Sequence, residues 1–189
     1  MTKQELSTDD TLPTRDNGMP TIRFLLIFSG AYIIFHILYF MVPNDVLGDI
    51  VYHKGIVSIA VNIINYCAPL EATQAIANKL VSTKASLEVV RGCDGAGATF
   101  LLIAAILAFS APWKDKLTGV VISLALMLII NQARIIGLYF IVAYKRDWFQ
   151  LVHTYLAPTF IIIISCLFFM WWAVRSRSSG VTNGQPRSA

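Results

Sequence analysis

The amino-acid sequence has 189 residues, of which 56% are hydrophobic and 14% are charged, and its mean hydropathy is +0.64. Soluble domains carry roughly 25% charged residues, so this chain has too few to cover a surface that faces water. The composition predicts a membrane protein and argues against a soluble enzyme or a disordered regulator. The net charge of +4 comes from scattered basic residues without a dense stripe, which argues against a nucleic-acid-binding domain.

The apolar residues are gathered into runs, and about 20 apolar residues are needed to cross a bilayer as a helix. Four runs approach or exceed this length: 24–42, 96–112, 117–143 and 151–174. We therefore predict an all-α integral membrane protein, built as a bundle of about four transmembrane helices.

The predicted membrane-embedded domain covers residues 23–174, and the polar segments 1–22 and 175–189 are expected to be flexible cytoplasmic tails. Lys and Arg residues outside the spans divide almost evenly between the two sides of the membrane in either topology, so the positive-inside rule does not decide the orientation. The polar residues within 46–70 favour the topology in which that segment does not span and both tails face the cytoplasm.

Residues 44–92 are predicted to form a cap of interfacial or re-entrant helical segments on the extracytoplasmic side. Asp49, Lys54 and other polar residues interrupt its apolar stretches. Within it, residues 71–81 have apolar residues at helical spacing and predict a short amphipathic helix. Residues 85–91 contain β-branched side chains and predict an extended segment.

Arg134 lies inside the third apolar run, where a charged side chain costs at least about 2.5–3.5 kcal/mol on insertion scales. Such a residue normally faces protein or water and has a role, and the four runs contain no Asp or Glu to pair with it. The alternative is an arginine that reaches up to the membrane interface. Asn131 lies one turn earlier on the same helix face and is a candidate supporting residue.

Cys93 is the cysteine with the most reactive setting, because it directly precedes an apolar helix whose free N–H groups favour an anion. Asp94 can cap this helix, although its charge opposes a thiolate. Cys67 and Cys166 lie in apolar segments and are expected to be inert. Three cysteines without a CxxC pair predict no metal site, and no cofactor is expected.

His153 begins the fourth run and can meet Cys93 and Arg134 by topology alone. In this order of helices, the start of the second span, the end of the third and the start of the fourth reach the same membrane face. A thiolate, an imidazole and a guanidinium together suit acyl transfer, as nucleophile, proton carrier and oxyanion donor.

At these segments the chain resembles the exosortase/archaeosortase family of membrane cysteine transpeptidases, over roughly residues 40–173. The resemblance rests on Cys93-Asp94-Gly95, on the N-x-x-R-I motif at Asn131–Ile135, and on His153. The usual cysteine motif is C-S-G, and the Asp in its second position, with the small size, is similar to the compact exosortase H branch. The resemblance implies Cys93 as nucleophile, Arg134 as stabiliser of the intermediate and His153 as acid/base.

The resemblance also implies an inner-membrane protein whose active face is extracytoplasmic or periplasmic. Its partners would be exported proteins that end in a recognition motif, a transmembrane helix and a basic cluster, together with membrane lipids and no nucleic acid. Small residues would let a substrate helix approach closely, and they predict a groove at Gly95, Gly97, Ala98 and Gly137.

Two other functions remain open from the sequence. A noncatalytic transporter subunit or polysaccharide-assembly accessory protein would use Arg134 to bind an anion or a lipid headgroup. A redox-active membrane thiol protein would need a partner for Cys93, and the sequence offers no apt one.

Overall fold

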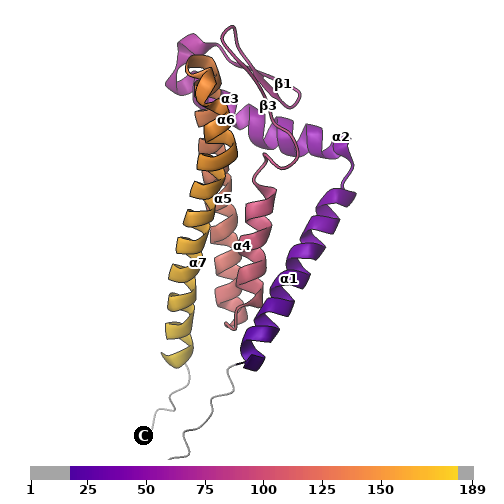
Figure 1. Ribbon diagram of the computed structural model, residues 1–189, viewed down its shortest axis with the longest axis vertical. Helices are drawn as coiled ribbons and strands as arrows, with labels where there is room; N and C mark the ends of the chain where they lie inside the picture. Colours follow the sequence, from indigo (N-terminus) through magenta and orange to yellow (C-terminus); the bar gives the residue numbers. More distant parts are fainter. Residues whose placement is uncertain (1–17, 183–189) are drawn as a thin grey trace, which may run out of the picture.

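The long helices of the chain run side by side along one axis of the molecule (Figure 1). The computed structural model describes residues 18–182. The helices along this axis are α1 (Gly18–Met41), α4 (Ala96–Ala108), α5 (Trp113–Tyr144) and α7 (Ala157–Thr182). Most of the two predicted tails lies outside the described residues. However, α1 begins and α7 ends within the segments predicted as tails, so the helices are longer than the apolar runs.

Within residues 18–182, four helical segments are long and apolar enough to cross a membrane: Thr21–Met41, Asn44–Cys67, Trp113–Tyr144 and Arg146–Arg177. This confirms the prediction of an all-α, multi-pass membrane protein. The predicted span at 96–112 is shorter than expected, because α4 ends at Ala108 and is only 13 residues long. Its length of about 20 Å is less than the thickness of a bilayer core. Lys116 Nζ donates to the Leu107 carbonyl at 2.7 Å. This bond satisfies a carbonyl in the last turn of α4 that has no N–H partner within the helix.

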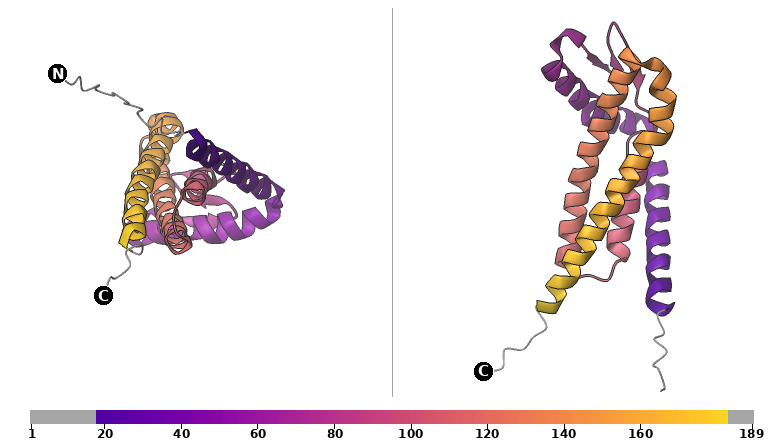
Figure 2. Two further views of the ribbon diagram at one scale, coloured as in Figure 1. Left: turned by 90° about the horizontal axis from the view of Figure 1, so that it is seen from below. Right: turned by 60° about the vertical axis from the view of Figure 1, so that its left-hand side comes forward.

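A second helical stretch runs obliquely across one end of the bundle (Figures 1 and 2). It consists of α2 (Asn44–Val46), the wider-wound η1 (Leu47–Val57) and α3 (Ser58–Cys67). Its length and composition would permit a crossing, but its direction differs from that of the other helices. The interfacial or re-entrant placement of residues 46–70 stays a prediction.

The rest of this end is a short turn, η2 (Pro69–Glu71), and a three-stranded antiparallel sheet. The strands are β1 (Gln74–Ile76), β2 (Lys79–Val81) and β3 (Ser86–Glu88), in the order β1-β2-β3. The amphipathic helix predicted at 71–81 is therefore wrong, while β3 lies in the segment predicted as extended.

The strand pattern explains why the helical spacing at 71–81 was misleading. Of the apolar residues on the supposed helix face, Leu80 is fully buried and Ile76 is 53% exposed. Leu80 lies opposite Ala75 on one side and Leu87 on the other, so cross-strand pairing decides which side chains are buried. Asn78 closes the turn before β2 by donating to the Val89 carbonyl at 2.9 Å.

A carboxylate joins the cap to the end of α5. Glu71 is 4% exposed and accepts hydrogen bonds from Lys84 Nζ at 2.7 Å, from the Tyr139 hydroxyl at 2.9 Å and from the Tyr144 hydroxyl. The Lys84 ammonium and these hydroxyls lower the pKa of Glu71 from 4.5 to about 2. The ionised carboxylate therefore stabilises the folded cap.

We predict that Glu71→Gln lowers the thermal unfolding temperature of the purified chain in detergent by several degrees at pH 7. The native pKa is below the ordinary value, so the stabilisation is present above about pH 4.5 and is lost as the pH falls toward 2. The difference between wild type and variant should shrink over that range. Glu88→Gln, which removes an exposed pair with Lys79, is the control and should have little effect. A gap that is constant with pH would contradict this account.

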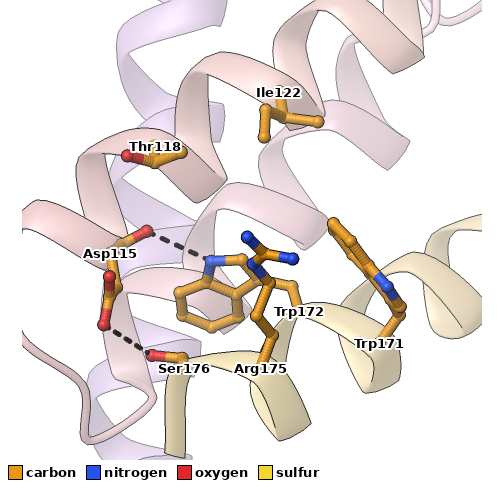
Figure 3. A pocket seen from close by; sticks show the side chains of 7 residues that line it. All are labelled: Asp115, Thr118, Ile122, Trp171, Trp172, Arg175 and Ser176. Carbon is orange, nitrogen blue, oxygen red and sulfur yellow. Dashed lines mark hydrogen bonds between the residues drawn. The ribbon is translucent and has the colours of Figure 1, made fainter. Parts of the chain in front are cut away.

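At the other end of the bundle, α7 packs closely on α5 through Trp172, which is 4% exposed. Its indole Nε1 donates to the Asp115 carbonyl at 3.1 Å, and the Ser176 hydroxyl lies 3.4 Å from the Asp115 carboxylate (Figure 3). A Cβ atom at Gly119 would lie 2.4 Å from Trp172 Nε1. Only glycine therefore fits at position 119.

We predict that Gly119→Ala destabilises the folded chain by about 1–3 kcal/mol, because Trp172 must move and loses its hydrogen bond. Gly137→Ala on the same helix is the matched control, since a Cβ there meets no atom within 4 Å. Chemical or thermal unfolding in detergent measures both variants. Equal stabilities for the two would contradict the packing argument.

Candidate functional site

Cys93 lies in the turn that connects the cap sheet to the start of α4. The turn covers residues 91–95, and Gly92 and Gly95 have positive φ angles of 93° and 80°. The Cys93 N–H donates to the Val90 carbonyl at 2.9 Å. The chain thereby reverses into α4, and Cys93 comes three residues before the first residue of the helix.

His153, the predicted acid/base, lies beside this thiol. Its Nε2 atom lies 3.7 Å from Cys93 Sγ, although the two residues are 60 positions apart. His153 belongs to η4 (Val152–Leu156), a wide turn that follows η3 (Arg146–Trp148) and α6 (Phe149–Leu151) and leads into α7. Its ring stacks on Phe149 at 5.1 Å between centroids. The structure thus brings two of the predicted catalytic residues into contact.

Arg134 is the third predicted catalytic residue, and it borders a cavity of about 280 Å³ beside the turn. The side chain is half-buried, and its Nε atom is buried without a hydrogen-bond partner among the described residues. A guanidinium that borders an apolar cavity can bind a carbonyl or an anion.

Three of the four predicted groove residues line the cavity beside Arg134, and the fourth does not. Gly95, Gly97 and Ala98 line the same cavity as Arg134, and Gly137 is not among the residues that line it. The cavity is bordered by α1, by the start of α4, by α5 and by α7, whose Pro158 contributes to the wall.

Asn131 lies against the turn that carries Cys93. It is 5% exposed, and its Oδ1 atom has no hydrogen-bond partner among the described residues. A Cβ atom at Gly95 would lie 3.0 Å from Asn131 Cγ and Oδ1, so this glycine allows the turn to approach α5. The glycine after Cys93-Asp94 is thus required by packing as well as by its φ angle.

The sequence reasoning missed the contribution of α1 to this site. The Tyr39 hydroxyl donates to the Asp94 carboxylate, and Arg91 donates to the Tyr39 carbonyl at 3.1 Å. Tyr39 near the end of an apolar run looks like an ordinary interfacial residue, so its spacing carried no signal of this contact. Asp94 also accepts from the Ala96 N–H at 3.3 Å, at the start of α4.

The arrangement offers a thiol, an imidazole and a guanidinium around the start of one helix. Among the described residues, no group of three or more His, Cys, Asp or Glu side chains could hold a metal ion. The chemistry available from these side chains is nucleophilic attack by sulfur with proton transfer by the imidazole.

Comparison with known proteins gives one match. The chain matches the family model described as transmembrane exosortase (Exosortase_EpsH) over residues 22–172, which is well over half of its length. No curated protein and no solved structure matches it. Membership of this family suggests a membrane transpeptidase, and the match spans Cys93, Arg134 and His153. The chain belongs to the transmembrane exosortase family.

Proposed function

We propose that the chain is a membrane-embedded cysteine transpeptidase. It cleaves the C-terminal sorting signal of exported proteins through a thioester and transfers them to an acceptor. The observation that carries this proposal is the distance of 3.7 Å between Cys93 Sγ and His153 Nε2. A thiol within reach of an imidazole is the arrangement that activates a cysteine nucleophile.

In the first half of the reaction, His153 Nε2 takes the proton of the Cys93 thiol. The sulfur attacks the carbonyl carbon of the scissile peptide, and the carbonyl oxygen becomes an oxyanion. The Arg134 guanidinium borders the apolar cavity and can stabilise this charge there. The C–N bond then breaks, and His153 returns the proton to the leaving amine.

In the second half, an acceptor with an amine or hydroxyl group attacks the thioester carbon. His153 removes the proton of the acceptor, the new bond forms, and the C–S bond breaks to release the thiolate. Water in place of the acceptor would give simple hydrolysis. The residues that perform this half are therefore the same as in the first.

The cavity beside Arg134 suits the substrate as well as the chemistry. Its wall at the start of α4 consists of small residues, and Leu101 and Ile162 on its rim are exposed. We place the sorting-signal helix here, with the scissile bond near Cys93. The wall from Gly95 to Ala98 keeps the cavity open, whereas larger side chains would fill it.

We predict that replacement of each catalytic residue blocks processing of a substrate carrying a motif, a transmembrane helix and a basic cluster. Cys93→Ala should abolish cleavage, His153→Ala should lower its rate about 10²–10⁴-fold and Arg134→Ala about 10²–10³-fold. Immunoblots of co-expressed substrate measure the processed fraction. Cys67→Ala is the matched control, because Cys67 is exposed at the end of α3, and it should process normally. Normal processing by Cys93→Ala would overturn the proposed function.

We further propose that the protein lies in the inner membrane with the cap and Cys93 on the extracytoplasmic side. In a variant that keeps Cys67 as its sole cysteine, a membrane-impermeant maleimide should label the exposed thiol in intact spheroplasts. A second variant has its three native cysteines replaced and carries Ser110→Cys, at the opposite end of the bundle. Labelling of this variant should require permeabilised cells. The reverse pattern would contradict this orientation.

A further inference from the structure

The carboxylate of Asp94 connects the Cys93 turn to two helices. One oxygen accepts from the Tyr39 hydroxyl on α1, and the other lies 3.3 Å from the Ala96 N–H at the start of α4. Because Asp94 directly follows Cys93, these bonds fix the backbone next to the thiol.

Arg91 fixes the other side of the turn to the same end of α1. Its guanidinium donates to the carbonyls of Tyr39 at 3.1 Å and Val42 at 3.2 Å, and to Asn44 Oδ1 at 2.8 Å. The Tyr39 carbonyl lies in the last turn of α1 and also accepts from the Val42 N–H at 3.3 Å, and Val42 directly follows the helix. The guanidinium also lies 4.9 Å from the centroid of the Tyr39 ring.

Tyr39 lies at the centre of these contacts. Its hydroxyl is 3.1 Å from the hydroxyl of Tyr52, which is 6% exposed within the cap. Its ring packs on Phe100 of α4, at 5.7 Å between centroids. One side chain of α1 therefore touches the cap, the turn and the helix that follows the turn.

The thiol needs such a support because its own surroundings constrain it little. Gly92 and Gly95 give the turn a backbone with wide conformational freedom. The Cys93–His153 contact of 3.7 Å is long and joins separate elements, so it cannot hold the turn in place by itself.

We infer that Tyr39 and Asp94 are positioning residues that set the Cys93 thiol against His153. The inference rests on the proposed function, in which this pair performs the acyl transfer. Tyr39 acts on the nucleophile through Asp94 and has no hydrogen bond to Sγ or to the imidazole among the described contacts. Helix α1 thus contributes to the active site.

The first test follows the reactivity of the thiol without any substrate. The full chain, purified in detergent with Cys67→Ala and Cys166→Ala, is alkylated with iodoacetamide across a range of pH, and His153→Ala serves as the reference. Tyr39→Phe and Asp94→Ala should move the pH profile toward that of His153→Ala. Asp94→Asn should lie nearer to wild type, since an amide can still bond to both Tyr39 and the Ala96 N–H. Tyr66→Phe is the matched control, because Tyr66 is 88% exposed in the cap, and it should leave the profile unchanged.

The second test measures turnover of the sorting-signal substrate. Tyr39→Phe should lower kcat about ten- to hundredfold, the range that corresponds to one lost hydrogen bond to a charged group, with little change in KM. A rise in KM with normal kcat would overturn the inference, because it would assign Tyr39 to substrate binding. Variants are compared only if they elute as one species and unfold near the wild-type temperature.

The outcomes separate this inference from the proposed function. If Tyr39→Phe and Asp94→Ala react as wild type while His153→Ala does not, the positioning role is overturned and the thiol–imidazole pair stands. If His153→Ala also reacts as wild type, the proposed function fails, and this inference fails with it.

Discussion

The close packing of α4 within the bundle determines where everything else in this molecule lies. This helix contacts α1, α5 and α7, and the view from below shows it enclosed among them (Figure 2). Its sequence allows this because Ala104, Ala105 and Ala108 are small and buried, so the neighbouring backbones approach closely. The helix is also much shorter than α5, and Lys116 satisfies a carbonyl in its lower turn. The first residue of α4 therefore lies beneath the cap, together with the turn that carries Cys93.

The cap and the membrane helices are joined by polar contacts that differ in character. On the α5 side, the Glu71 carboxylate accepts hydrogen bonds from one lysine and two tyrosines. On the α1 side, Tyr39, Asp94 and Arg91 form a network around the turn. The first holds the cap to the bundle, and the second holds the reactive segment between them. In both, tyrosine hydroxyls donate to a carboxylate at the edge of an apolar environment, where an unpaired carboxylate would be costly.

The sequence was informative where chemistry and hydropathy coincide. The charge of Arg134 inside an apolar run predicted a side chain that faces protein or water, and it lies half-buried at a cavity. The order of the runs predicted Cys93 and His153 at one end, where they lie 3.7 Å apart. The sequence was uninformative where contacts between distant residues decide the local structure. Residues 71–81 show helical spacing, yet pairing with Ser86–Glu88 makes them strands. Tyr39 could not be recognised either, because its role depends on contacts with residues 13 and 55 positions away.

The 60-residue separation between Cys93 and His153 also concerns the biosynthesis of the chain. Cys93 leaves the ribosome well before His153, and the helix that follows His153 must still insert before the last packing contacts exist. Until then the thiol has no imidazole beside it and the cavity lacks the wall supplied by Pro158. Completion of the last helix is therefore the event that brings the imidazole beside the thiol, and chains that stall or are truncated before it lack the Cys93–His153 pair.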